Sequence, residues 1–101
     1  MLKNHNYFVY ITTNTHRTSV YVGMTNNLTV RLQQHYENRG NPKSWAGKYH
    51  CYHLVWWERH QYVEHAIERE KEIKKWRREK KNKLVESLNP KWTFLNEEVQ
   101  E

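Results

Sequence analysis

Two tyrosines, Tyr10 and Tyr21, stand in stretches rich in β-branched and aromatic residues, a composition typical of β-strands. Taken alone, a strand tyrosine is usually a packing residue. Tyr21, however, is followed by Val22 and Gly23, and a glycine has no Cβ, so a substrate or another backbone segment can come close. If the two stretches pair as a hairpin, the phenol rings lie side by side and could take part in proton transfer.

Arg31 and His35 are four residues apart, which places both side chains on one face of a helix. An arginine is a planar donor suited to a phosphate, and a histidine can take or give a proton near neutral pH. His35 also shares an apolar stripe with Leu28 and Leu32, so we expect it to point toward the strands. The plainer alternative is a half-buried histidine with ordinary hydrogen bonds and an exposed arginine.

A carboxylate, Glu70, falls near the middle of a stripe on a later helical segment. The stripe consists of Val63, Ala66, Ile67, Ile73 and Arg77. A carboxylate is costly among apolar residues unless it is paired or bound to a cation. Glu70 could pair with Arg77 or Lys74, or it could hold Mg²⁺, which prefers one or two carboxylates and keeps several waters.

A dense basic tract follows this carboxylate, with only Glu72 and Glu79 as acidic members. The tract contains Lys71, Lys74, Lys75, Arg77, Arg78, Lys80, Lys81 and Lys83. The chain has a formal net charge of +6, so we expect an anionic partner, either nucleic acid or a membrane surface. A charge run is usually a solvated face, but the density of this one, with Trp76 inside it, indicates contact with phosphates.

The 101 residues suffice for one domain with a modest core. Aromatic residues make up 14% of the chain, which argues against disorder and makes large rings the basis of that core. No apolar run is long enough to span a membrane. A single cysteine, Cys51, excludes an internal disulfide, and the N-terminus lacks the apolar core of a signal peptide, so we expect a cytoplasmic protein.

The elements that must position these side chains follow from the same pattern. Tyr7–Thr13 and residues 19–24 are predicted to form an antiparallel hairpin, and Leu28–Glu37 a helix that ends before Gly40 and Pro42. Residues 43–49 are expected to form a loop. Residues 51–58 are predicted as the third strand, central in the sheet because their apolar run suits cover on both faces.

The C-terminal half is expected to be helical. A long helix is predicted over residues 63–80 and a shorter one around Leu84, Val85 and Leu88, ended by Pro90. Residues 97–101 are expected to form a frayed acidic tail. The order β-β-α-β-α-α therefore predicts an α+β fold, a small three-stranded antiparallel β-sheet flanked by helices in a single domain over residues 1–101, with its core at about 6–96.

In their order and spacing, these features resemble the GIY-YIG nuclease family. Phe8-Val9-Tyr10 is similar to the first family motif and Tyr21-Val22-Gly23 to the second. The match continues through Asn27-Leu28, Arg31-x-x-x-His35, Lys48-Tyr49, Ala66-x-x-x-Glu70-x-x-Ile73-Lys74 and Asn89-Pro90-Lys91-Trp92. Each motif is weak alone, but the ordered set is specific. The small stand-alone bacterial members, similar to the N-terminal nuclease module of the excinuclease C subunit, resemble the chain most.

The resemblance implies a role for each site residue. Tyr10 or Tyr21 would help to deprotonate the attacking water, with Tyr10 favoured as the base and His35 as its proton relay. Arg31 would stabilise charge on the scissile phosphate. Glu70 would anchor one divalent cation, Mg²⁺ or Mn²⁺, which polarises the phosphate and assists the leaving oxygen. Contacts with DNA are expected from Lys48, Tyr49, Lys71, Lys74, Lys75, Arg77 and Arg78.

The chain departs from the family pattern at a few positions. Phe8 replaces the leading glycine of the first motif, and Met24 stands where some relatives have a lysine. A late family asparagine aligns with Thr93, and either Asn89 or Asn96 could replace it. These departures motivate an alternative function, a catalytically weak or inactive nucleic-acid-binding module that keeps the fold.

A second alternative is a transition-metal site. Its ligands would be His50, Cys51 and His53, with His60 or His65. His50 and Cys51 are adjacent in the sequence, so on a strand they would point to opposite faces, and this alternative has little weight.

The function that these observations predict is a metal-dependent endonuclease that hydrolyses DNA phosphodiester bonds in DNA repair or recombination. The chain offers no second module to read a base sequence. Selectivity is therefore expected to come from DNA structure or from a partner protein. The oligomeric state is left open.

Overall fold

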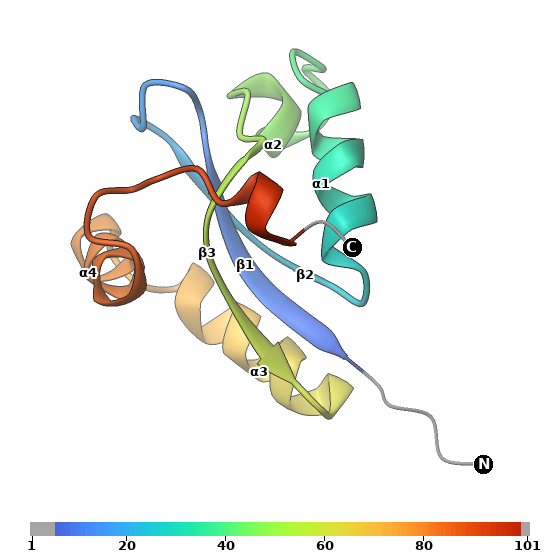
Figure 1. The fold of residues 1–101 in the computed structure, drawn as a ribbon, viewed down its shortest axis with the longest axis vertical. Helices are drawn as coiled ribbons and strands as arrows, with labels where there is room; N and C mark the ends of the chain where they lie inside the picture. The colour runs from blue at the N-terminus through green and yellow to red at the C-terminus, as the bar shows by residue number, and fades with distance from the viewer. Residues whose placement is uncertain (1–5, 100–101) are drawn as a thin grey trace.

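The computed structural model describes residues 6–99, which form an α+β fold around a three-stranded antiparallel sheet. The strands are β1 (Tyr7–Thr13), β2 (Val20–Thr25) and β3 (His53–His60), in the order β2-β1-β3 across the sheet. β1 pairs with both of its neighbours in antiparallel fashion (Figure 1). The predicted fold class and the order β-β-α-β-α-α are therefore confirmed.

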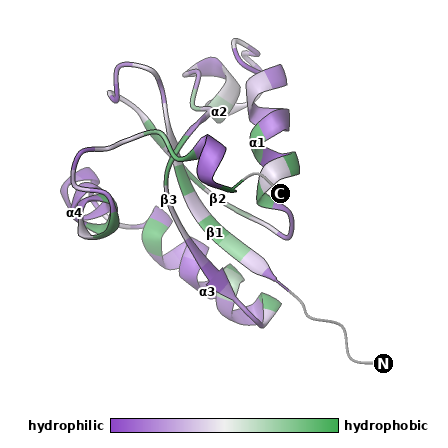
Figure 2. Ribbon diagram, viewed as in Figure 1, coloured by the Kyte–Doolittle hydropathy of each residue, from purple (hydrophilic) through white to green (hydrophobic). Residues whose placement is uncertain are grey.

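Helices cover both faces of this sheet. α1 (Leu28–Glu37) and the short 3-10 helix η1 (Asn96–Val99) lie on one face, and α3 (Val63–Lys74) and α4 (Arg78–Leu88) lie on the other (Figure 1). The four-residue helix α2 (Trp45–Lys48) connects α1 to β3. Apolar residues concentrate along the strands and on the helix faces turned toward them, as Figure 2 shows.

The central strand is β1, so the prediction that the third strand is central is wrong. Residues Val9 to Thr13 of β1 are all buried, because alternate side chains face the two helical layers. The apolar run in β3 has another cause. Between Ile11 and Thr12 the register of β1 with β3 shifts, because Ile11 pairs with Trp56 and Thr12 with Leu54, which leaves Val55 as a bulge. Consecutive apolar residues of an edge strand can therefore all be buried.

Two element boundaries near the site differ from expectation. α1 has the predicted bounds, and the Asn27 side chain caps it by accepting a hydrogen bond from the Val30 amide at 3.0 Å. Residues 43–49, expected as a loop, contain α2, which Ser44 caps by accepting from the Gly47 amide at 3.0 Å. β2 begins one residue later and β3 two residues later than predicted.

The single long helix predicted over residues 63–80 is wrong, because the chain forms α3 and α4 with a corner between them. Trp76 packs against the core at this corner, and Arg77 has an extended backbone (φ −66°, ψ 156°). No glycine or proline marks the break, so no local signal predicts it.

Residues 97–99 of the expected frayed tail belong to η1. The Thr29 hydroxyl of α1 donates a hydrogen bond to the Val99 carbonyl at 2.8 Å, and this holds the end of η1 against α1. Residues 100 and 101, also part of the expected tail, lie outside the described residues.

Candidate active site

The register of the β1–β2 hairpin places the two tyrosines on one face of the sheet. Tyr10 pairs with Gly23, and Thr12 pairs with Tyr21, so Tyr10 and Tyr21 are diagonal neighbours on adjacent strands. Their ring centroids are 6.3 Å apart. The predicted side-by-side arrangement of the rings is therefore confirmed.

Gly23 provides the space in which the Tyr10 ring lies. A Cβ at position 23 would be 2.4 Å from Oη of Tyr10 and 2.5 Å from its Cζ, well inside van der Waals contact. The sequence suggested that this glycine admits a substrate or a backbone segment. In the structure, the group that approaches it is the tyrosine paired with it across the hairpin.

The Tyr10 hydroxyl is held between two side chains of α1. Nε2 of His35 lies 2.7 Å from Oη of Tyr10, and Nε of Arg31 donates to the same oxygen at 3.3 Å. Because the arginine can only donate, the single phenol proton is free to point at His35. A neutral His35 then accepts this proton on Nε2 and carries its own proton on Nδ1. α1 therefore points both side chains toward the strand, as their spacing predicted.

The pKa values keep the proton on Tyr10 at neutral pH. Burial, with the positive charge of Arg31, lowers the pKa of His35 to about 4. Burial and the charge of an ionised Tyr21 raise the pKa of Tyr10, although the hydrogen bond and charge of Arg31 oppose the rise. Burial disfavours the charge of Arg31, but its interactions with the hydroxyls of Tyr10 and Tyr21 raise its pKa. The resting site is a neutral phenol and a neutral imidazole beside one arginine cation.

The low pKa of His35 predicts that the protein loses stability as the pH falls from about 6.5 to 4. An unfolded histidine, with a pKa near 6.5, binds a proton in this range that the folded His35 does not bind. The free energy of unfolding should fall by about 2 kcal/mol between pH 7 and pH 5 through this residue. Urea unfolding at the two pH values measures it.

The matched variant for this measurement is His35→Gln, which keeps a hydrogen-bond acceptor for Tyr10 but cannot be protonated in this range. The loss between pH 7 and pH 5 should be smaller in this variant by about 2 kcal/mol. His50→Gln, a change at an exposed histidine, should retain the loss seen in the wild type. An equal pH dependence in the wild type and His35→Gln would contradict the assignment.

Glu70 reaches the tyrosine pair from the other side of the sheet. Its carboxylate is half-buried and lies 3.6 Å from Nζ of Lys74, and this Nζ lies 5.8 Å from the centroid of the Tyr21 ring. α3 packs along β1 and β2, and β2 is an edge strand, so these side chains extend past the edge to the tyrosine face. Of the two partners left open for Glu70, the structure selects Lys74 and not Arg77.

Met24 stands where some relatives have a lysine, and the structure shows where its side chain lies. Met24 packs against the core on the face of the sheet opposite to Tyr21, beside Val9, with which it pairs. The cation near the Tyr21 ring is instead Lys74, from α3.

The two asparagines considered for the late family position both bind main-chain groups around β3. The Asn89 amide donates to the carbonyls of Val55 at 3.0 Å and Thr93 at 2.8 Å. Asn96 accepts from the Leu54 amide at 2.8 Å and donates to the Tyr52 carbonyl at 2.9 Å. Both side chains therefore attach the C-terminal segment to the sheet.

The residues expected to contact DNA are distributed over α2, α3 and the start of α4. Lys48 and Tyr49 belong to the α2 region. Lys71 and Lys74 are exposed on α3, and Lys75 is exposed directly after it. Arg77 is exposed at the corner before α4. Arg78 is occupied within the protein, because it donates to the Thr18 carbonyl at 2.9 Å and to the Arg17 carbonyl at 3.4 Å. Arg78 therefore ties α4 to the β1–β2 loop.

Sequence reasoning missed Trp45, whose ring stacks on Tyr21 with 27° between the planes and 6.4 Å between the centroids. The available signal was Ser44, a typical N-cap, followed by aromatic and basic residues at Trp45, Lys48 and Tyr49. A helix of four residues is too short to produce a hydrophobic period, so the segment was expected to be a loop.

The structure does not support the alternative of a transition-metal site. Among residues 6–99, no group of three or more histidine, cysteine, aspartate or glutamate side chains is placed to share a metal ion. Cys51 is buried with its Sγ 3.7 Å from the Ser19 carbonyl, and the His53 ring stacks on Phe94 at 3.8 Å. Mg²⁺ has a smaller requirement, since one carboxylate with waters and a substrate phosphate can hold it.

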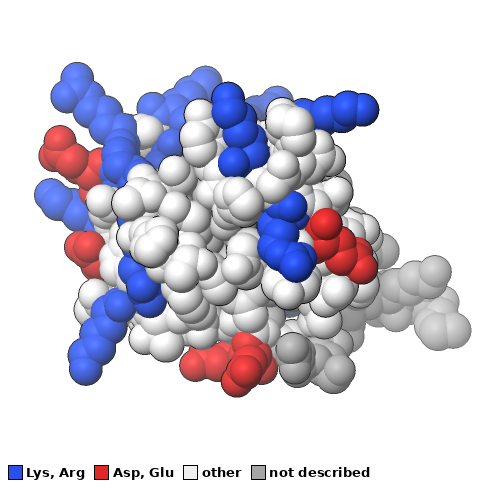
Figure 3. Space-filling model, turned by 90° about the horizontal axis from the view of Figure 1, so that it is seen from above, with Lys and Arg blue, Asp and Glu red and all other residues white. Residues whose placement is uncertain are grey.

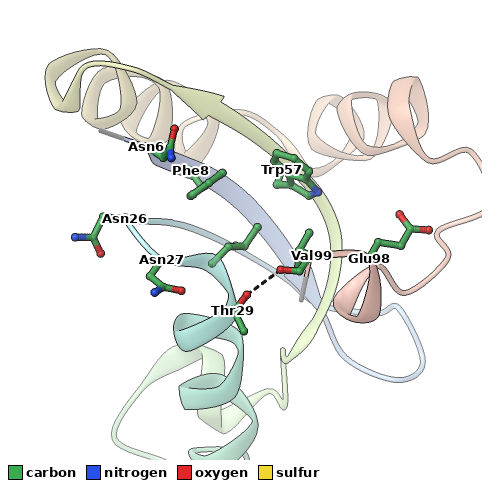
Figure 4. Close-up of a pocket in the computed structure, with 9 residues that line it drawn as sticks. Asn6, Phe8, Asn26, Asn27, Thr29, Trp57, Glu98 and Val99 are labelled. Atoms are coloured by element: carbon green, nitrogen blue, oxygen red, sulfur yellow. Dashed lines mark hydrogen bonds between the residues drawn. The ribbon is translucent and has the colours of Figure 1, made fainter. Parts of the chain in front are cut away.

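A separate cavity of about 310 Å³ opens on the same face of the sheet as the tyrosines. Phe8 and Trp57 form one wall and Thr29 and Val99 the other (Figure 4). Leu28 also lines the cavity. The cavity is not lined by the candidate site residues, which are Tyr10, Tyr21, Arg31, His35 and Glu70. The candidate site is therefore a surface at the edge of the sheet, beside β2.

The helices among residues 6–99 are too short or too polar to cross a membrane.

A three-stranded antiparallel sheet that brings two tyrosines together with an arginine, a histidine and a glutamate defines the GIY-YIG class of catalytic domain. The chain belongs to this family, because the sequence model of the GIY-YIG catalytic domain matches residues 6–83. The fold is similar to the solution NMR structure of the UPF0213 protein BH0048 from Bacillus halodurans, with a TM-score of 0.53 and 25% sequence identity over 86% of this chain and 89% of that one. No curated protein is similar enough to be identified as a relative.

Proposed function

We propose that this protein is an endonuclease that hydrolyses DNA phosphodiester bonds with the help of a divalent cation. The observation that supports it most strongly is the hydrogen-bonded chain from Arg31 through Tyr10 to His35. The Glu70 carboxylate lies near the neighbouring Tyr21 ring through its contact with Lys74. The chain belongs to a family whose catalytic domain is typically a nuclease, and this supports a role for these residues in hydrolysis.

The two tyrosines take different parts in the proposed reaction. Hydrolysis joins the oxygen of water to phosphorus and breaks a bond from phosphorus to an oxygen of the neighbouring nucleotide, so the attacking water must lose a proton. Tyr10 is completely buried, whereas Tyr21 is partly exposed. Although the sequence favoured Tyr10 as the base, this burial favours Tyr21 as the tyrosine beside the water. Tyr10, which is hydrogen-bonded to His35, then holds Arg31 by accepting its hydrogen bond.

Arg31 serves the proposed reaction in two ways. Its positive charge favours the ionised form of Tyr10 and so opposes the rise in pKa that burial causes. Its planar guanidinium also offers donors to a phosphate whose negative charge increases in the transition state. The carboxylate of Glu70 balances this cluster of cations.

The donor set at Glu70 suits Mg²⁺ or Mn²⁺. Glu70 is one carboxylate with a lysine partner at 3.6 Å, longer than a direct hydrogen bond, so the carboxylate can exchange that partner for a divalent cation. When bound, such a cation supplies positive charge to the scissile phosphate. Glu70 would hold it, and Lys74 would remain beside Tyr21.

A cleavage screen tests this function. We expect the protein to cut branched, nicked or plasmid DNA when Mg²⁺ or Mn²⁺ is present. Excess EDTA should stop the reaction because it removes the cation that Glu70 would hold. Gel analysis of labelled DNA measures the products, and restoring Mg²⁺ after EDTA should restore the rate. If no DNA structure is cut with either metal, the proposal is wrong.

The finer features of the proposal rest on the sequence resemblance. The chain is proposed to be a bacterial nuclease module, similar to that of excinuclease C, which acts in DNA repair or recombination in the cytoplasm. A partner protein or DNA structure would direct it to its substrate.

A second candidate is a module that binds nucleic acid without cutting it. Met24 in place of a lysine and the main-chain contacts of Asn89 and Asn96 favour it. Salt-dependent binding to DNA, without cleavage under any metal, would support it over the nuclease.

A further inference from the structure

α2 carries two exposed aromatic side chains next to the candidate active site. Trp45 is 50% exposed and Tyr49 39% exposed, and their ring centroids are 4.6 Å apart. Trp45 stacks on Tyr21, which in turn lies 5.3 Å from the His35 ring. A continuous row of rings therefore leads from the buried hydrogen-bonded cluster to the solvent.

The position of Trp45 does not arise from burial of its own ring. The buried residues of α2 are Ala46 and Gly47, and a Cβ at Gly47 would lie 2.7 Å from the carbonyl oxygens of Asn38 and Asn41. α2 is thus held tightly against the segment that follows α1. The indole remains half exposed on a fixed backbone, an arrangement that stability alone does not require.

Positive charges surround this row of rings. Nζ of Lys48 lies 5.4 Å from the centroid of the Tyr49 ring, and Nζ of Lys74 lies 5.8 Å from that of Tyr21. Figure 3 looks onto the end of the molecule where Figure 1 places α2, and there mostly lysine and arginine side chains ring an uncharged centre. An exposed aromatic surface with a cationic border is complementary to a ligand that has both flat rings and negative charges.

We propose that Trp45 stacks on an unpaired base of single-stranded DNA next to the phosphodiester bond that the site cuts. This inference rests on the proposed function and names its substrate class. In a duplex, neighbouring bases cover both faces of each base, so a protein ring can stack only on a base that has left the helix. Phosphate contacts need lysine and arginine but no exposed indole. Trp45 therefore selects unpaired DNA.

The test measures binding in EDTA, so that no cleavage interferes. Fluorescence anisotropy follows a labelled single-stranded DNA of about 15 nucleotides, its duplex, and a single-stranded RNA of the same sequence. We expect the wild type to prefer the single-stranded DNA to the duplex. Trp45→Ala should weaken single-strand binding about 5- to 150-fold, the equivalent of about 1–3 kcal/mol for one base–aromatic stack, and change duplex binding less than about twofold.

Two further variants give the test its controls. Trp45→Phe retains a flat ring and should keep most of the single-strand affinity. Tyr62→Ala removes an equally exposed ring (55%) at the start of α3 and should bind as the wild type does. If Trp45→Ala does not fold by circular dichroism, Tyr49→Ala takes its place, with a loss for single-stranded DNA larger than for the duplex.

Several results would overturn the inference. An equal loss of affinity for single strand and duplex would show that Trp45 has a structural role. No loss of affinity for either would show that Trp45 does not contact DNA and would favour a partner protein as the ligand of this surface. Binding of RNA but not DNA would exclude the DNA substrate. The proposed nuclease function fails separately. If the protein binds single strands through Trp45 but never cuts DNA, the stacking role of Trp45 stands and the nuclease function is wrong. If the protein cuts only duplex DNA, and does so independently of Trp45, the nuclease function stands and the stacking role is wrong.

Discussion

Replacement of Glu70 with alanine is expected to lower DNA cleavage about 1,000-fold, which corresponds to about 4 kcal/mol of transition-state stabilisation. Glu70 is the carboxylate that the fold brings to the tyrosine cluster, through its contact with Lys74 above Tyr21. Without it, the site retains its cations and hydroxyls but has no anionic ligand for a divalent ion. The rate under single-turnover conditions with saturating Mg²⁺ measures the effect.

The stability of this variant should change little. The pair of Glu70 and Lys74 is long and partly exposed, and such pairs contribute about 0–1 kcal/mol. Loss of activity with an unchanged unfolding midpoint therefore separates a chemical role from a structural one. The matched control is Glu68→Ala, an exposed glutamate on the same helix, which should cut DNA at the wild-type rate. Equal residual cleavage in the Glu70 and Glu68 variants would show that the carboxylate has no part in the reaction.

The local signals in the sequence were sufficient for the fold class and for α1. The Asn27 cap, the apolar stripe and the stop residues are all contiguous, so they determine the helix bounds without help from the rest of the chain. The arrangement of Tyr10 and Tyr21 on adjacent strands followed in the same way from a short hairpin. Features that depend on contacts between distant segments could not be obtained so directly.

The strand order is such a feature. An apolar run in β3 indicated a strand covered on both faces, but the bulge at Val55 turns consecutive residues toward the core, and a bulge leaves no mark on composition. The corner between α3 and α4 is another case, because the packing of Trp76 fixes it and not a helix-breaking residue. Both errors arose where tertiary contacts override the local periodicity.

The candidate site likewise has features that the local sequence predicts and features that depend on tertiary contacts. The sequence indicated the residue types and their helical faces, and the structure brings Tyr10, Tyr21, Arg31 and His35 together as expected. The partner of Glu70 and the place of Trp45 depended on how α3 and α2 approach the edge of β2. No spacing along the chain encodes those approaches, so only the folded molecule could provide them.

Replacement of Gly23 with alanine is expected to reduce cleavage at least about 100-fold and to cost about 1–3 kcal/mol of stability. The new Cβ would lie 2.4 Å from Oη of Tyr10, so the ring must move by about 1 Å to reach an ordinary contact. That movement breaks the 2.7 Å hydrogen bond to His35 and displaces the oxygen to which Arg31 donates. Cleavage rates and urea unfolding of the same preparation measure both effects.

A double-mutant cycle shows whether the clash itself is the cause. In the Tyr10→Ala background the ring is absent, so adding Gly23→Ala should cost almost no further stability. The coupling between the two positions should therefore be as large as the cost of Gly23→Ala alone. If Gly23→Ala costs the same in both backgrounds, the glycine serves the backbone of β2 and not the Tyr10 ring. A coupling of the expected size would mean that Gly23 is required because its missing Cβ leaves room for the Tyr10 ring. The position of that ring in turn fixes the position of Arg31.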